Sequence, residues 1–116
     1  MRLRETIDWG IDLGTTNSSI AVFDGRDIKV VKNNRNDEVT PSAIYEKRIG
    51  NNISKKIGIK AKDKLIEDPE HVALEFKQNI GLKDWYFEFP STGRKATAVD
   101  LSAEVLGELI GSVKQR

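Results

Sequence analysis

The chain has 116 residues, and its charge is nearly balanced, with 19 Lys and Arg residues against 18 Asp and Glu residues. It contains no cysteine and one histidine, which excludes a disulfide framework, a thiolate zinc site and a site built on several histidines. Hydrophobic residues make up 38% of the sequence, enough for a small core, and the net charge of +1 gives no support for nucleic-acid binding. Since no segment has the pattern of a membrane span or a signal peptide, we expect a soluble cytoplasmic domain without nucleic-acid or membrane partners.

The first 36 residues contain three strand signals. In residues 7–13 apolar side chains alternate with aspartate and glycine, which predicts a strand with one buried face. Apolar runs at residues 20–23 and 28–31 predict two further strands, and Asp24-Gly25 between them is a turn signal. We therefore expect three consecutive antiparallel strands joined by short connections.

The middle of the chain mixes strand and helix signals. Residues 39–45 form another strand candidate, but Pro41 inside it cannot donate to a sheet ladder and indicates an edge strand or a bend. Residues 59–68 have apolar positions spaced for one face of a helix, which Pro69 ends. A second helix, stopping at Gly81, is predicted from the spacing of four apolar residues, Val72, Ala73, Phe76 and Ile80.

The last third of the sequence predicts a hairpin followed by a helix. Two short runs around a Pro-Ser-Thr-Gly turn, within residues 85–99, indicate the hairpin. Asp100 and Ser102 are candidates for the cap of the helix that follows. Gly107 and Gly111 either weaken that helix, by up to about 1 kcal/mol each relative to alanine, or mark a face where another element packs closely.

The strongest candidate for chemistry follows the first predicted strand. Asp12 places a carboxylate near the end of that strand, and Gly14 is free to adopt a tight turn. Thr15 and Thr16 then offer hydroxyls and successive backbone N–H groups, with Asn17 behind them. Such a turn can form a concavity for phosphate oxygens, and a neighbouring carboxylate can hold the water molecules of an accompanying Mg²⁺. An ordinary hairpin turn uses the same residue types, so the pattern leaves both interpretations open.

Two basic features also allow a structural and a functional interpretation. Lys77 follows Phe76 inside the second predicted helix, and the pattern alone favours a solvated lysine whose aliphatic stem packs on its neighbours. The alternative is an ammonium that reaches a phosphate or an attacking water. Residues 47–64 are rich in lysine and arginine, but an acidic stretch follows them, so a solvated face is favoured there over nucleic-acid contact.

The order of motifs along the chain resembles the seventy-kilodalton heat-shock chaperones of the DnaK type. Residues 11–18, Ile-Asp-Leu-Gly-Thr-Thr-Asn-Ser, resemble the opening of these proteins, although actin-like proteins and sugar kinases have a similar first phosphate loop. The later motifs favour the chaperones because they come in the same order: Thr40-Pro41-Ser42, Ile57-Gly58, Ala61-Lys62, Asp68-Pro69-Glu70, Phe76-Lys77, Ile80-Gly81 and residues 101–106. The similarity spans essentially the whole chain.

The resemblance implies an α+β or α/β fold, as part of an ATPase lobe of the actin-like, ribonuclease-H-like type. It places the first strands of the inner subdomain at residues 1–36 and the outer subdomain at residues 37–116. By the same resemblance Asp12 organises Mg²⁺ through water, and Lys77 is the catalytic residue that approaches the terminal phosphate and the attacking water. The residues implied to bind ATP or ADP are Gly14, Thr15, Thr16, Asn17 and Lys77.

The resemblance also implies a function. A DnaK-like chaperone couples ATP hydrolysis to the binding and release of unfolded polypeptides, with J-domain co-chaperones and nucleotide-exchange factors as partners. Glu38-Val39 and Gln78 depart from the family pattern, which indicates a divergent member. The alternative is a nucleotide-binding regulatory or assembly module of the actin-like superfamily that does not fold clients.

The family's second phosphate loop, its other catalytic carboxylates, its adenine-binding residues and its peptide-binding domain would all follow Arg116. We therefore expect the chain to be an N-terminal fragment that does not turn over ATP by itself. We also expect the fragment to self-associate, since an unpaired sheet edge and an apolar face would be exposed.

Overall fold

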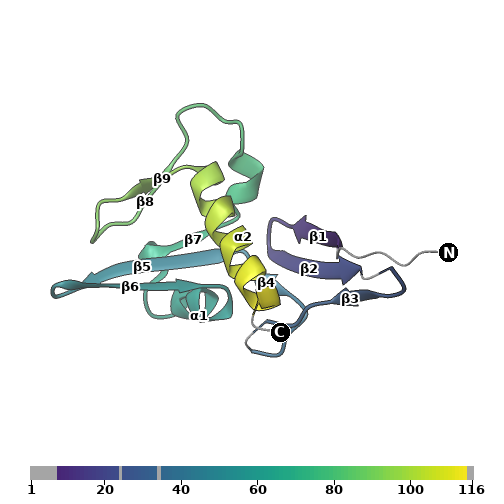
Figure 1. Cartoon of the computed structure of the whole chain (residues 1–116). Helices are drawn as coiled ribbons and strands as arrows, with labels where there is room; N and C mark the ends of the chain where they lie inside the picture. Colours follow the sequence, from purple (N-terminus) through teal and green to yellow (C-terminus); the bar gives the residue numbers. More distant parts are fainter. Residues whose placement is uncertain (1–7, 24, 34, 115–116) are drawn as a thin grey trace.

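A computed structural model describes residues 8–23, 25–33 and 35–114 of the chain. Its elements form one sheet near the N-terminus, a second sheet and a small hairpin after it, and a long C-terminal helix (Figure 1). The strands are β1 (Asp8–Leu13), β2 (Asn17–Phe23), β3 (Ile28–Val30), β4 (Thr40–Pro41), β5 (Ala43–Ile49), β6 (Asn52–Ile57), β7 (Val72–Leu74), β8 (Phe87–Glu88) and β9 (Lys95–Ala96). The α-helices are α1 (Ile59–Lys62) and α2 (Ala98–Lys114), and three 3₁₀ turns are η1 (Asp63–Leu65), η2 (Pro69–His71) and η3 (Phe76–Asn79).

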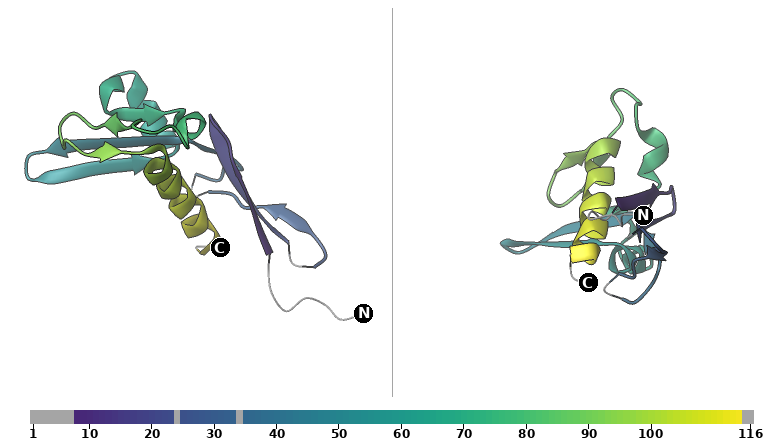
Figure 2. Two further views of the ribbon diagram at one scale, coloured as in Figure 1. Left: turned by 90° about the horizontal axis from the view of Figure 1, so that it is seen from above. Right: turned by 45° about the vertical axis from the view of Figure 1, so that its right-hand side comes forward.

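The three predicted N-terminal strands are confirmed as the antiparallel order β1-β2-β3. The expectation of a buried face on the first strand is wrong for the described residues, because Trp9 is 44% exposed and Ile11 is 40% exposed. Ile7, the first residue of that pattern, lies outside the described residues. Ile20 of β2 is the apolar residue of these three strands that is deeply buried among the described residues, at 1% exposure, and it packs in the core with residues of the C-terminal helix. The first sheet therefore projects away from the rest of the molecule, as Figure 2 shows.

The strand predicted over residues 39–45 is broken directly after Pro41, which lacks the N–H that a continuous ladder would need. The short strand β4 pairs with the start of β2, with Asn17 opposite Pro41, and Ser42 then separates β4 from β5. The chain thus leaves the first sheet and enters the second within three residues. This tight passage brings Ser42 next to the β1–β2 connection.

The second sheet has the order β6-β5-β7, and the first four residues of its central strand β5 are buried on both faces. Alternate residues of β5 belong to different clusters: Ala43 and Tyr45 pack with α1, whereas Ile44 packs with α2. The helix predicted over residues 59–68 is present as the single turn of α1 followed by η1.

The second predicted helix, over residues 72–80, is wrong. Val72 and Ala73 lie in β7, where they pair with Tyr45 and Ile44 of β5. Glu75 then has a left-handed conformation with φ of 53°, which ends the strand and starts the 3₁₀ turn η3. Pairing with the edge of β5 satisfies the backbone of this segment and still buries its apolar side chains. The helical spacing of those side chains was therefore compatible with a strand followed by a turn.

The C-terminal helix α2 is confirmed, and so is Asp100 as a capping residue, but sequence analysis missed its partner Thr97. The hydroxyl of Thr97 accepts a hydrogen bond from the N–H of Asp100 at 3.1 Å, and the Asp100 carboxylate accepts one from the N–H of Thr97 at 3.0 Å. This reciprocal capping box lowers the pKa of Asp100, chiefly through the hydrogen bond from the Thr97 backbone. Ser102, the other predicted cap residue, lies within the helix, where it is buried. At Gly107 and Gly111 an added Cβ would meet no described atom within 4 Å, so no close packing explains these glycines there.

The main core lies where α2 packs against the second sheet, η3 and the β8–β9 hairpin. Its most deeply buried members are Ile20, Ile44, Ala73, Phe76, Phe89, Ala96, Leu101 and Val105. A buried carboxylate, Glu46, ties these elements together, since it accepts hydrogen bonds from Thr92 at 2.7 Å and from Arg94 at 3.0 Å. None of the helices in the described part of the chain has the length and hydropathy needed to cross a membrane.

Candidate functional site

The β1–β2 connection is a tight turn that only glycine can begin. A Cβ added at Gly14 would lie 2.3 Å from the carbonyl oxygen of Asn17, which is far inside van der Waals contact with backbone. The Asn17 carbonyl therefore folds back over Gly14. The residues between, Thr15 and Thr16, form the outer part of this turn.

Ser42 holds this turn from the second segment of the chain. Its hydroxyl donates to the carbonyl of Gly14 at 2.9 Å, and its N–H donates to the carbonyl of Thr16 at 2.9 Å. The hydroxyls of Ser18 and Ser42 lie 2.8 Å apart, and because Ser42 uses its single O–H on Gly14, Ser18 is the donor between them. Both serines are buried, at 1% and 2% exposure. Two carbonyls of the turn are thus directed toward buried partners.

The hydrogen-bond donors of the turn remain available. Among the described residues, no partner takes the backbone N–H groups or the hydroxyls of Thr15 and Thr16. A turn whose carbonyls are bound on one side and whose N–H groups are free suits an anion with several oxygens. The geometry at Gly14 and the donor set both fit a phosphate group.

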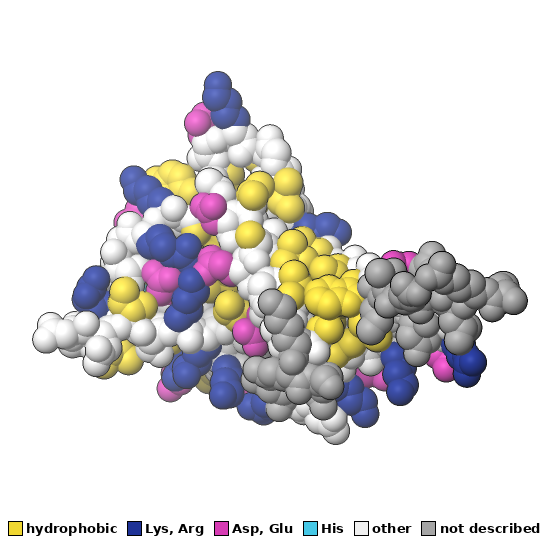
Figure 3. Space-filling model, viewed as in Figure 1, with side chains coloured by type: hydrophobic (Ala, Val, Ile, Leu, Met, Phe, Trp, Pro, Cys, Tyr) yellow, Lys and Arg dark blue, Asp and Glu magenta, His cyan; other side chains and the backbone are white. Residues whose placement is uncertain are grey.

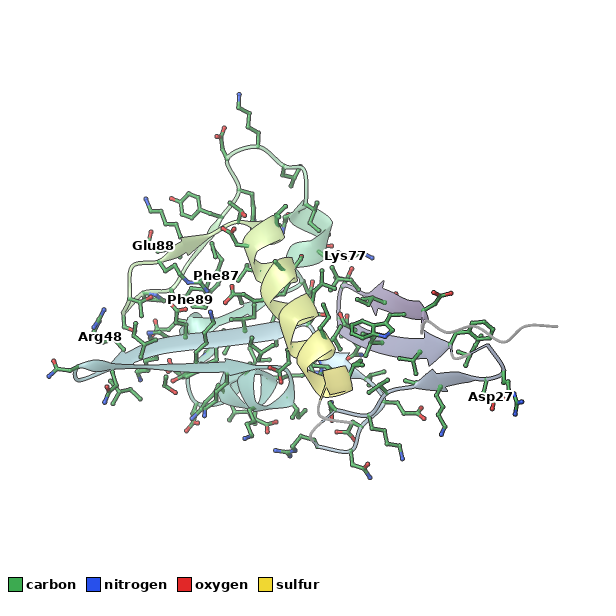
Figure 4. The ribbon with its side chains drawn as sticks, in the orientation of Figure 1. Asp27, Arg48, Lys77, Phe87, Glu88 and Phe89 are labelled. Carbon is green, nitrogen blue, oxygen red and sulfur yellow. The ribbon has the colours of Figure 1, made fainter. Side chains whose placement is uncertain are left out.

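Asp12 and Lys77 flank this turn from two different elements. Asp12 is exposed near the end of β1, two residues before Gly14. The turn η3 lies beside the C-terminal end of β1 in Figures 1 and 2, and the Lys77 side chain extends from η3 toward the side on which β1 and β2 lie (Figure 4). Phe76, buried at 1% exposure, fixes η3 to the core, while Lys77 is exposed and forms no ion pair within the described ranges.

The structure therefore gathers the predicted site residues at one end of the first sheet, although Lys77 lies in a 3₁₀ turn and not in a helix. The binding and catalytic roles assigned to these residues, Asp12, Gly14, Thr15, Thr16, Asn17 and Lys77, remain predictions. Sequence analysis missed Ser42 as a positioning residue. Its neighbour Pro41 was the available signal, since a break in a strand can bring the next residue against another segment.

A second polar cluster surrounds His71, which is buried at 6% exposure. Its Nδ1 lies 2.7 Å from Asp68, whose carboxylate also accepts from Tyr45 at 3.1 Å and from Lys47 at 3.2 Å. The hydrogen bond with His71 is the largest cause that lowers the pKa of Asp68; burial opposes it, and Lys47 and Tyr45 add to it. Asp68, Glu70 and His71 have ligating atoms within 4.8 Å of one another. Because the Asp68 carboxylate already accepts from His71, Tyr45 and Lys47, we interpret the cluster as structural and not as a metal site.

This cluster predicts a specific pH dependence of stability. Because the folded-state pKa of Asp68 lies below the ordinary value of about 3.9, its carboxylate stabilises the fold above that pH and loses the effect as the pH falls through the folded-state pKa. Urea unfolding between about pH 5 and about pH 2 should show a steeper loss of stability for the wild type than for Asp68→Asn. The matched control is Asp63→Asn, at an exposed residue of η1, which should follow the wild type. Parallel curves for wild type and Asp68→Asn would contradict the assignment.

Comparison with known protein families agrees with this geometry. The family model described as Hsp70 protein matches residues 8–107, which include the β1–β2 turn, Ser42, η3 and most of α2. Members of this family have an ATPase domain of actin-like fold that binds nucleotide with Mg²⁺, and the mixed α+β architecture with antiparallel sheets is compatible with part of such a domain. Because the match covers most of the sequence and contains the candidate site, the chain belongs to the Hsp70 family.

Proposed function

We propose that this chain forms the phosphate-binding side of the nucleotide site in a DnaK-like, ATP-hydrolysing chaperone of the cytoplasm. One observation carries the proposal: Ser42 binds two carbonyls of the β1–β2 turn, and the N–H groups and hydroxyls of Thr15 and Thr16 are left without partners in the described structure. Membership of the Hsp70 family supports the choice of a nucleotide as the anion. The other side of the site would come from a larger ATPase domain.

Each residue has a role that follows from its chemistry. Thr15 and Thr16 donate hydrogen bonds to phosphate oxygens, and Asn17 adds an exposed side-chain amide at the same turn. Asp12 holds water molecules of a magnesium ion, which keeps several of them when bound. Lys77 brings an ammonium toward the terminal phosphate and orients the attacking water. When bound, Mg-ATP supplies the phosphoanhydride and the metal charge that neutralises it.

We further propose that ATP turnover in the larger protein controls the binding and release of unfolded polypeptides. J-domain co-chaperones and nucleotide-exchange factors are the partners that this cycle requires. Family membership supports this coupling. The departures from the family pattern at Glu38-Val39 and Gln78 bear on how the chain contacts its partners, and not on the coupling itself. Val39 is 49% exposed, so the first departure changes a surface that other proteins or subdomains can contact.

Calorimetry with Mg-ADP tests the proposed site. We expect the 116-residue chain to bind at least about 100-fold more weakly than an ATPase domain that contains it, because one side of a cleft cannot offset the entropic cost of association. Asp12→Asn in the larger domain should weaken binding of Mg-ADP more than binding of ADP measured with a chelator. Equal affinities for the chain and the larger domain would contradict the proposal, as would an Asp12→Asn effect independent of the metal.

The exposed face of the first sheet supports a separate proposal, self-association of this chain. Figure 3 shows a hydrophobic patch over this sheet, and Trp9 and Ile11, which lie on the same face of β1, are 44% and 40% exposed. Antiparallel pairing of two β1 edges centred on Gly10 would place Asp8 opposite Asp12, so contact through the face is favoured over contact through the edge. Light scattering should give a mass that rises with concentration and returns to the monomer value in Ile11→Ser. A concentration-independent monomer in the wild type would rule it out.

A further inference from the structure

A basic cavity is lined by residues other than those of the turn and Lys77. It has a volume of about 220 Å³ and is formed by the end of β6, the start of α1, the connection before β4 and one residue of α2. Its lining residues are Asn33, Arg35, Thr40, Lys55, Lys56, Ile57, Gly58, Ile59, Lys60 and Glu108. Glu108 belongs to the C-terminal half of α2, whereas η3 packs beside the other half of that helix (Figure 1). The cavity therefore shares no residue with the proposed nucleotide site.

The charge of this cavity is unbalanced. Four of its side chains are basic, and Glu108 is its one carboxylate. The positive charge of Lys55 is neutralised by residues outside the cavity, since its ammonium forms ion pairs with Glu46 and Glu104. Over the described ranges, no carboxylate forms an ion pair with Arg35, Lys56 or Lys60. Three cations thus border one small space without a matching set of anions.

The walls of the cavity are fixed in place. Asn33 is 7% exposed, and its side-chain oxygen accepts from the N–H groups of Arg35 at 2.9 Å and Asp37 at 3.0 Å. Its amide donates to Thr40 Oγ1 at 3.0 Å, which fixes the segment that carries Arg35.

The opposite wall meets this segment at Gly58. The φ of Gly58 is 89°, and a Cβ added there would lie 2.9 Å from Thr40 Cγ2. Gly58 therefore lets the start of α1, and with it Lys60, approach the wall that carries Thr40 and Arg35. The basic side chains project from a backbone that is already organised.

We propose that this cavity binds a small multivalent phosphate anion. Ammonium and guanidinium groups bind phosphate oxygens through charge-assisted hydrogen bonds, and arginine can do so with two parallel bonds. The volume admits a compact anion with a few oxygen-bearing centres but not a folded partner. This inference does not rest on the proposed nucleotide function, because no residue is common to the two sites.

Calorimetric titration of the 116-residue chain with pyrophosphate, without Mg²⁺, tests this site. Lys56→Gln combined with Lys60→Gln should weaken binding about tenfold, since each cation near a surface contributes a factor of about three to five. Lys62→Gln is the matched control, because Lys62 is exposed on the same helix as Lys60 but does not line the cavity. It should leave the affinity within about twofold of the wild type.

A variant that gains affinity makes the test independent of damage to the fold. Glu108→Gln removes the one carboxylate of the cavity and should tighten pyrophosphate binding about threefold. Thermal unfolding monitored by circular dichroism shows whether each variant is folded. The proposal is overturned if the wild type does not bind at about 10 mM pyrophosphate. It is also overturned if Lys62→Gln weakens binding as much as the double variant, or if Glu108→Gln leaves the affinity unchanged.

Discussion

Replacing Lys77 with alanine is expected to remove most ATP turnover from an ATPase domain that contains this chain, while nucleotide binding is largely retained. Lys77 is exposed and forms no ion pair in the described structure, whereas its neighbour Phe76 is the buried residue of η3, so the fold should not change. The ammonium acts on charge that develops during phosphoryl transfer, and loss of one such group lowers the rate by about 100- to 1,000-fold. Single-turnover hydrolysis and calorimetry with Mg-ADP separate the two effects.

Lys83→Ala is the matched control for this variant. Lys83 is an exposed lysine six residues further along the chain, outside η3. Its loss should leave both turnover and binding unchanged. If Lys77→Ala reduces binding and turnover by the same factor, the lysine serves ground-state binding and not the chemical step. If turnover is unchanged, Lys77 has no catalytic role.

Gly14→Ala should abolish nucleotide binding and also destabilise the fold. The new Cβ would lie 2.3 Å from the Asn17 carbonyl oxygen, so the backbone of the turn must move. Movement at this point also breaks the hydrogen bond between the Gly14 carbonyl and Ser42. Overpacking of this kind costs about 1–3 kcal/mol of unfolding free energy, which urea unfolding measures directly. Calorimetry on the larger domain reports the loss of nucleotide binding.

Gly10→Ala controls for the general effect of adding a methyl group to this strand. Gly10 lies in β1, four residues before Gly14, and a Cβ added there meets no described atom within 4 Å. The unfolding free energy of Gly10→Ala should stay within about 0.5 kcal/mol of the wild-type value, and the nucleotide affinity of this variant should not change. If the two variants behave alike, the close contact at Gly14 is not what shapes the site.

The sequence predicted those parts of the fold that depend on local patterns. Alternation over residues 7–13 and the two apolar runs after it were enough to place β1, β2 and β3, and helical spacing was enough for α2. The second helix failed because Val72 and Ala73 find partners in β5, nearly 30 residues earlier in the chain. Spacing within a short window cannot show which distant strand has a free edge.

The residues of the candidate site could be predicted from the sequence, but the tertiary contacts that position them could not. Asp12, Gly14, Thr15 and Thr16 could be read together because they are neighbours in sequence. The contact that turns their carbonyls inward comes from Ser42, 28 residues away from Gly14. The position of Lys77 beside β1 likewise depends on β7 and η3, which follow from tertiary pairing.

The most direct test of the phosphate-binding turn is a titration of isotope-labelled chain with Mg-ADP, followed by amide NMR. The predicted result is that the N–H signals of Thr15 and Thr16 shift together with those of Asn17, that the shifts saturate, and that they are absent in Gly14→Ala but present in Gly10→Ala. If the signals of other residues shift and saturate while those of Thr15 and Thr16 do not move, the assignment of this turn as the nucleotide phosphate site is contradicted.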